Sequence, residues 1–182
     1  MTRPGSADLT SAIGANLPYL RRYARALTGS QTSGDTFAAA TLEALLEDMS
    51  VLDAADSPKV ALFHVFHLVW ASAGAPVGEA DSSLSAQAQR HMARLTPNSR
   101  EALLLSVIEG FSHVEIGGIL QIDTDEAAEL IGIAMREGGD ILALGRNLKL
   151  MQQVGRGSLF RFHPHVAGHG LETHRNRRVH GH

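Results

Sequence analysis

The chain has 182 residues, of which 44% are hydrophobic and 5% aromatic, and it contains no cysteine, which excludes a disulfide framework and any thiolate nucleophile. Its net charge of −3 is unevenly divided: residues 1–144 hold nine Lys and Arg against eighteen acidic residues, whereas residues 145–182 hold seven against one. No signal peptide is visible, and no apolar run reaches the roughly 18 residues that span a membrane, so we expect a cytoplasmic protein without a membrane partner.

Three helices are predicted in the first half of the chain. Apolar residues recur at helical spacing over residues 7–28, and again in a second helix that starts near Ser33 or Asp35 and runs to about residue 49. Ser57 and Pro58 are typical of an N-cap followed by a proline at the first helical position, and they start a third helix that is expected to end near residue 73. This third helix is apolar on nearly all sides, which indicates a position at the centre of a bundle.

A helix-turn-helix is predicted in the second half. Thr96 and Pro97 repeat the cap-and-proline start of a helix. Ser112 and Glu115 then form a capping box that opens a short helix. Residues 121–123 make a tight turn before a last helix, and this order of helix, turn and helix is the signature of the motif.

The predicted fold is therefore all-α, with two small helical subdomains. The first covers residues 7–71 and the second covers residues 95–142. Residues 72–94 join them as a linker with a short helix, because their first part is small, polar and acidic. Residues 143–182 are rich in His, Arg and Gly and show no sustained helical period, which predicts a disordered basic tail.

The second subdomain resembles the C-terminal region of sigma factors. The pattern L-x-P-x-x-R-E-x-L-L-L runs from Leu95 to Leu105, and E-G-x-S-x-x-E-I-x-x-I-L-x-I runs from Glu109 to Ile122. Together the two patterns are far more specific than a lone glycine motif. The resemblance implies a fold like sigma region 4.

The last helix departs from that pattern at the positions where a DNA-reading sigma factor carries cations. This chain has Glu129, Ile131 and Ala134 there, so we interpret the three as lost DNA-contact positions. DNA binding draws much of its free energy from neutralising phosphates with Lys and Arg. An acidic helix would repel the phosphates, so no DNA partner is predicted.

Residues 17–70 resemble the region-2 bundle of small sigma factors, though more weakly. The corresponding helix of a working sigma factor combines aromatic residues with cations that hold the melted promoter strand. Here the helix has Phe63, Phe66 and Trp70 but no cation after Lys59. Aromatic stacking without a basic groove makes a poor site for single-stranded DNA.

Both halves together, over residues 10–142, resemble the sigma-like domain of PhyR-type general stress response regulators (extracytoplasmic-function, or ECF, sigma-like regions 2 and 4). The resemblance implies a sigma-factor mimic without enzymatic activity or cofactor. Its partner would be a small helical anti-sigma factor of the NepR type, whose capture frees a stress sigma factor. In the family a receiver domain follows, but the 38 residues after Leu144 hold a single acidic residue, Glu172. We therefore expect no phosphoacceptor Asp in this chain, and a receiver domain that is lost or acts in trans.

The expected partner contacts are apolar side chains that would face the linker from both subdomains. They are assigned by position, because no motif fixes them. The set comprises Phe63, Phe66, Trp70, Phe111, Leu130 and Ile131.

Two other functions stay open at this point. The first is a genuine ECF-type sigma factor or helix-turn-helix transcription factor that binds promoter DNA with help from the basic tail. The second is a degraded gene product with no stable partner. His64 and His67 lie three apart on one helix, but no third ligand is evident, so no metal site is predicted. Gly117 and Gly118 are interpreted as weak points of their helix.

Overall fold

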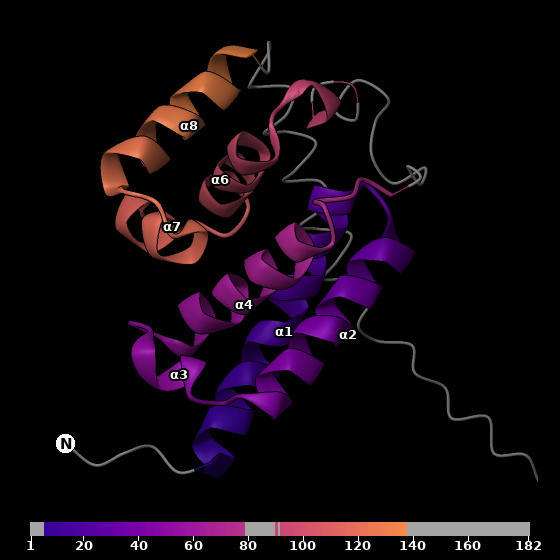
Figure 1. The fold of residues 1–182 in the computed structure, drawn as a ribbon, viewed down its shortest axis with the longest axis vertical. Helices are drawn as coiled ribbons and strands as arrows, with labels where there is room; N and C mark the ends of the chain where they lie inside the picture. The colour runs from indigo at the N-terminus through magenta and orange to yellow at the C-terminus, as the bar shows by residue number, and fades with distance from the viewer. Residues whose placement is uncertain (1–5, 79–89, 91, 138–182) are drawn as a thin grey trace, which may run out of the picture.

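The computed structural model describes residues 6–78, 90 and 92–137, and the regular structure within these ranges is entirely helical. The all-α prediction is therefore confirmed for the described residues. The helices form two groups, drawn in indigo to magenta and in pink to orange in Figure 1. The first group contains α1 (Ser6–Thr28), α2 (Gln31–Glu47), α3 (Val51–Ala54) and α4 (Pro58–Ser72), and the second contains α6 (Pro97–Val107), α7 (His113–Leu120) and α8 (Thr124–Glu137).

Most of the predicted linker and the whole predicted tail, residues 143–182, lie outside the described residues. The subdomain boundaries at residues 7–71 and 95–142 accordingly stay predictions. Within the described ranges, no helix is long and apolar enough to cross a membrane.

The helix starts follow from local capping chemistry. The side chains of Ser57, Thr96 and Ser112 each accept a hydrogen bond from a backbone N–H in the first turn of the helix that follows. At Ser112 the capping box is complete, because the Glu115 carboxylate accepts from the Ser112 N–H at 2.8 Å. Each such cap contributes about 1 kcal/mol. The three predicted starts are confirmed.

Two helix limits differ from the prediction. The second helix begins at Gln31, since the Ser30 side chain accepts from the N–H of Ser33 and caps it earlier than the periodicity indicated. It ends at Glu47, whereas the prediction extended it to about residue 49. The short helix α3 then follows. The start of this helix is therefore set by the capping hydroxyl of Ser30, and the spacing of the apolar residues did not indicate it.

Helix α4 lies at the centre of the molecule, as its all-round apolar sequence predicted. It contacts α1, α2 and α3 in its own group and α7 in the other. Phe63, Phe66 and Trp70 are at most 1% exposed. Tyr23 of α1 packs its ring against Phe63 and Phe66, with centroids 5.2 and 5.5 Å away. Such aromatic pairs contribute about 0.5–1.5 kcal/mol beyond their buried area.

The two neighbouring glycines of α7 are not equivalent, which the sequence did not reveal. A Cβ on Gly117 would lie 2.8 Å from the backbone oxygen of Ile122, in the turn before α8. A Cβ on Gly118 would have nothing within 4 Å. Gly117 therefore permits the close turn between α7 and α8, and only Gly118 is a weak point of the helix.

We expect Gly117→Ala to lower the free energy of unfolding by about 1–3 kcal/mol, because the added carbon overlaps a backbone atom that cannot rotate away. Gly118→Ala, the matched control one residue along, should raise it by about 0.5–1 kcal/mol through reduced chain entropy. Urea unfolding followed by circular dichroism measures both. Equal effects of the two substitutions would contradict the close approach.

Candidate partner-binding surface

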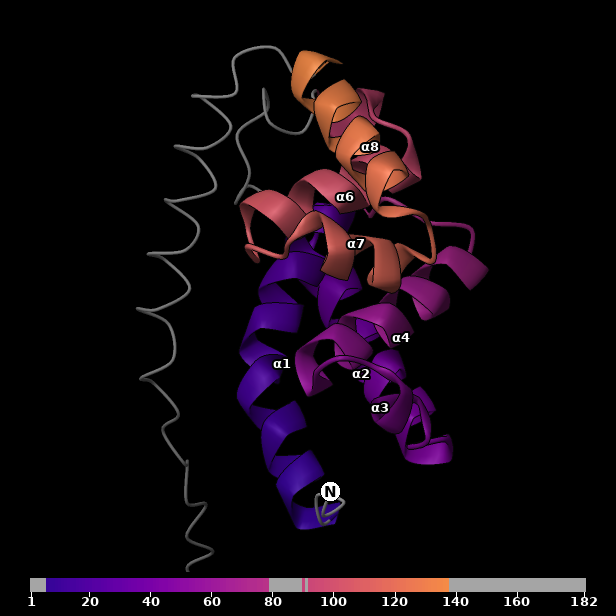
Figure 2. The same ribbon diagram turned by 90° about the vertical axis from the view of Figure 1, so that its left-hand side faces the viewer.

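The two groups of helices pack against each other along a contact that we call the seam. It joins α1 and α4 of the first group to α6 and α7 of the second, and Figure 2 shows α6 and α7 above α1 and α4. The seam has an aromatic part, around Phe63 and Phe111, and a polar part, around Glu101 and Glu109. These parts differ in what they contribute to holding the groups together.

The aromatic part of the seam is closed to solvent. The rings of Phe63 in α4 and Phe111, in the loop before α7, meet edge to face with centroids 5.0 Å apart and an interplanar angle of 70°. Phe111 is 6% exposed. The ammonium of Lys59 lies 4.3 Å from the Phe111 ring centroid and 5.5 Å from the Tyr19 ring centroid. Lys59 therefore makes cation–π contacts with both rings at the outer edge of the aromatic part.

The first polar contact is centred on Glu109, just beyond the end of α6. Its side chain is 0% exposed, and its Oε1 accepts hydrogen bonds from Arg22 Nη2 at 2.9 Å and Nε at 3.1 Å. Lys59 Nζ donates to the backbone oxygen of Glu109 at 3.1 Å and lies 3.7 Å from its Oε2. Within the described structure, Oε2 is buried without a hydrogen bond.

Burial raises the pKa of the Glu109 carboxyl above its ordinary value of 4.5, although the charges and hydrogen bonds of Arg22 and Lys59 oppose the rise. Burial is therefore the largest influence on the pKa of this carboxyl, and its two cationic partners act against it. A buried ion pair of this kind is weak evidence for stability.

We expect Glu109→Gln to change how stability depends on pH. Because its pKa is raised in the folded chain, the Glu109 carboxyl binds its proton more tightly there than in the unfolded chain. The free energy of unfolding of the wild type therefore falls as the pH rises from the ordinary pKa of the carboxyl to its raised pKa in the folded chain. The glutamine variant lacks that loss and should be at least as stable near neutral pH. Chemical denaturation over a pH series measures the difference, with Glu43→Gln, an exposed change of the same charge, as control. A difference that is independent of pH would contradict the uncompensated burial.

The second polar contact is centred on Glu101 of α6, which is 0% exposed. Its Oε1 accepts from the Tyr23 hydroxyl at 3.1 Å, and its Oε2 lies 2.6 Å from His67 Nδ1. Burial, followed by the charge of Glu101, raises the pKa of Tyr23 well above its ordinary value, so the phenol keeps its proton and donates it. Both oxygens of this carboxylate are thus partnered by residues of the first group.

The two histidines of α4 have packing roles at the seam. His67 meets Glu101, and His64 Nδ1 lies 2.8 Å from the backbone oxygen of Ile119 in α7. Because a carbonyl oxygen only accepts, His64 carries its proton on Nδ1. Among the described residues no group of three His, Cys, Asp or Glu side chains is placed to hold a metal.

Most of the predicted contact residues are buried in this arrangement. Phe63, Phe66 and Trp70 belong to the core of the first group, and the indole N–H of Trp70 donates to the backbone oxygen of Pro76 at 3.1 Å. Phe111 and Ile131 are also buried, at 6% and 5% exposed. Of the six, Leu130 alone is half-buried rather than buried. Their role in binding stays a prediction, and in this structure five of the six side chains are covered.

The predicted lost DNA-contact positions separate into two kinds. Glu129 is exposed on α8, together with Asp125 and Glu126. Ile131 and Ala134 are buried, at 5% and 0% exposed. Their apolar side chains belong to the hydrophobic core where α8 packs on α6 and α7, and the interpretation of the three as lost DNA-contact positions stays a prediction. The loss of a phosphate-binding surface rests on the acidic exposed face alone.

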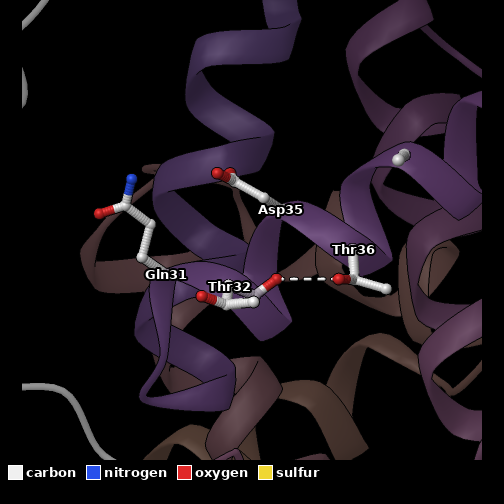
Figure 3. Close-up of a pocket in the computed structure, with 5 residues that line it drawn as sticks. Gln31, Thr32, Asp35 and Thr36 are labelled. Carbon is white, nitrogen blue, oxygen red and sulfur yellow. Dashed lines mark hydrogen bonds between the residues drawn. The ribbon is translucent and has the colours of Figure 1, made fainter.

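The described part of the chain has a shallow hollow on α2, lined by Gln31, Thr32, Asp35, Thr36 and Ala39 (Figure 3). The Thr36 hydroxyl in it donates to the backbone oxygen of Thr32 at 2.9 Å. Asp35 is paired with Arg21, whose Nε and Nη2 each donate to one carboxylate oxygen at 2.8 Å. Because these polar groups serve the helix and the α1–α2 contact, the hollow has no group poised for chemistry.

The sequence interpretation missed the residues that hold the seam, Arg22, Lys59, Glu101 and Glu109. One signal was present: Glu101 and Glu109 lie in and just after a helix whose leucines must be buried. Acidic residues among side chains that must be buried require charged or hydrogen-bonding partners. The sequence does not indicate which cations or hydrogen-bond donors contact these two glutamates.

Two family models match the chain. The sigma2 domain of PhyR matches residues 13–67, and the sigma-like domain of the response regulator PhyR matches residues 92–138. Among curated proteins, the phyllosphere-induced regulator PhyR of Methylorubrum extorquens is 42% identical over 122 residues, which is 67% of this chain and 46% of that protein. The chain thus spans about half the length of this relative.

Solved structures show the same fold. The PhyRSL–NepR complex from Sphingomonas sp. Fr1 is 32% identical, with a TM-score of 0.61 over 96% of this chain and 98% of that one. PhyR complexed with NepR from Bartonella quintana is 32% identical, with a TM-score of 0.60 over 71% and 48%. The sigma factor RpoE of Bartonella quintana, solved with NepR, shares the fold at 17% identity, with a TM-score of 0.62 over 75% and 97%.

Proposed function

Because this chain belongs to the PhyR family of sigma-like regulators, we propose that it is a sigma-factor mimic that binds a small helical anti-sigma factor of the NepR type. Binding would withdraw the anti-sigma factor from a stress sigma factor and so free that sigma factor for transcription. The proposal is supported by the solved PhyR–NepR complexes, whose sigma-like part this chain resembles over nearly its whole length. The location would be cytoplasmic, where transcription takes place.

The single observation that favours a protein partner over DNA is the exposed face of α8. Asp125, Glu126 and Glu129 lie on it, at the place where a region-4 helix reads DNA. Like charge opposes phosphate binding, which supplies most non-specific affinity for DNA. The family is regulatory, and we propose no catalytic activity for the chain.

The proposed function is tested by titrating the whole chain with a purified NepR-type anti-sigma factor in a calorimeter, with no phosphodonor added. We expect a 1:1 complex with a Kd tighter than about 1 μM, or about −8 kcal/mol. A parallel gel-shift series with promoter DNA over increasing salt should show no retained complex. Absence of anti-sigma binding at micromolar concentration, together with steep salt-dependent DNA binding, would instead support a DNA-binding factor.

A further inference from the structure

The turn between α7 and α8 forms a shallow hollow on the surface of the second group of helices. Val114 lines it and is 62% exposed, and a Cβ on Gly118, which also lines it, would meet nothing within 4 Å. Asp123 and Glu126 line the same hollow, and both are exposed. The hollow therefore suits a ligand that carries an apolar group beside a cation.

The acidic charge continues from the hollow along α8. Glu129 is exposed and lies three positions after Glu126 and four after Asp125, so the three carboxylates are neighbours on one side of the helix. The helix dipole favours negative charge in the first turn, but Glu129 lies one turn further, where like charges at this spacing destabilise a helix. Among the described residues, neither these three carboxylates nor that of Asp123 forms an ion pair. A cation bound at this face would relieve the repulsion.

We propose that the hollow and the acidic face of α8 bind a segment of the same chain, residues 156–162, which we call the basic segment. Residues 145–182 hold seven Lys and Arg against one acidic residue, whereas residues 1–144 hold nine against eighteen. The two phenylalanines of this basic part of the chain, Phe160 and Phe162, flank Arg161, and Arg156 lies nearby in the sequence. The basic segment thus combines cations with apolar rings, which is the chemistry that the hollow suits.

The basic segment can reach the hollow from the end of α8. This helix has 14 residues and is therefore about 21 Å long. The stretch from Glu137 to Phe160 spans up to about 75 Å when it is extended, so it can return along α8 to the start of the helix. Because the segment belongs to the same chain, its effective concentration is in the millimolar range. A contact with a Kd of about 1 mM would therefore be occupied in about half of the chains.

The contact has a consequence for nucleic acids. The bound segment would hold its cations on the acidic face of α8, at the place where a region-4 helix reads DNA. Cations that are paired with Glu126 or Glu129 are not available to neutralise phosphates. The basic segment would thus act against DNA binding, which is the opposite of its role in a transcription factor whose tail contacts DNA. The inference goes beyond the proposed function, because it requires no anti-sigma factor.

The test uses the absence of cysteine, which allows one nitroxide label to be attached to the whole chain through Ser158→Cys. The label broadens the NMR signals of backbone amides that lie near it. We expect broadening at Val114, Gly118 and Glu129, and none at Leu46 of α2, which is 78% exposed. Salt at about 1 M shortens the Debye length to about 3 Å and should therefore reduce the broadening.

Charge-neutralising variants identify the surface that binds the segment. Asp123→Asn with Glu126→Gln should lower the ratio of docked to free chains on the order of fivefold, because two exposed ion pairs are lost. Glu43→Gln with Glu47→Gln is the matched control, since it removes the same charge from exposed positions of α2 and should leave the broadening unchanged. Broadening that persists undiminished in the first variant would overturn the assignment of the hollow.

Two further comparisons identify the segment and the chain to which it belongs. Arg161→Gln should lower the ratio of docked to free chains about two- to fivefold, whereas Arg175→Gln, the same change further along the chain, should not alter it. Equal losses in the two variants would overturn the assignment of residues 156–162. In a mixture, the nitroxide is placed on chains without isotope label and the signals are read from isotope-labelled chains without nitroxide. Broadening in this mixture would show binding between two copies and overturn docking within one chain, as would the absence of broadening in every sample.

Discussion

Replacing Phe63 by alanine is expected to lower the free energy of unfolding by about 3–5 kcal/mol, a large part of the 5–15 kcal/mol that holds a typical domain folded. Phe63 is 1% exposed, and its ring contacts Tyr23 of α1 at 5.2 Å and Phe111 at 5.0 Å between centroids. Its removal leaves a cavity that spans the core of the first group and the seam. Urea unfolding followed by circular dichroism measures the loss.

Leu68→Ala is the control for this change, because Leu68 lies on the same helix and is 44% exposed. Its truncation should cost less than about 1 kcal/mol, since a partly hydrated side chain buries little apolar area. The comparison also decides the sequence-based role of Phe63. If Phe63→Ala is no more destabilising than Leu68→Ala yet abolishes anti-sigma binding, Phe63 is an exposed contact and the closed seam is wrong.

Replacing Gly34 by alanine is the second large effect that we expect, on the order of 1–3 kcal/mol or more of lost unfolding free energy. Gly34 of α2 is buried against α1, where a Cβ would lie 2.7 Å from the backbone nitrogen of Arg25 and 2.9 Å from the carbonyl carbon of Ala24. These are backbone atoms, so no side-chain rotation relieves the overlap. The two helices would have to move apart along their contact.

Gly14→Ala provides the matched control within α1, because a Cβ at that position meets nothing within 4 Å. It should raise the free energy of unfolding by about 0.5–1 kcal/mol through better helix propensity. Thermal melts of both variants measure the contrast. Stabilisation by Gly34→Ala as well would show that α1 and α2 are not in close contact at this point.

The helices themselves were largely predictable from the chain. Ser57 with Pro58, Thr96 with Pro97, and the capping box at Ser112 each fix a helix start through atoms within about one turn. The central position of α4 also followed from its sequence, since an all-round apolar helix cannot be stable at a surface. Where prediction failed, at the start of α2, a capping hydroxyl took precedence over the apolar period.

The burial of the three lost DNA-contact positions could not be predicted from the sequence. The pattern identified Glu129, Ile131 and Ala134 as one set, because all three replace cations of a sigma factor. The fold separates them, with Glu129 exposed and the other two buried. The sequence distinguishes an acidic residue from an apolar one, but the side of α8 that faces α6 is decided by the packing of whole helices.

By itself, then, the sequence determined the helical class, the capped helix starts, the resemblance to a sigma factor and the acidic character of its last helix, because these depend on short-range periodicity and capping. The tertiary structure alone decided that the aromatic side chains are covered and that Glu101 and Glu109 hold the seam. Tyr23 meets Glu101 across 78 positions of the chain, and Arg22 meets Glu109 across 87. Whether a buried carboxylate is satisfied depends on atoms that only folding brings within hydrogen-bond distance.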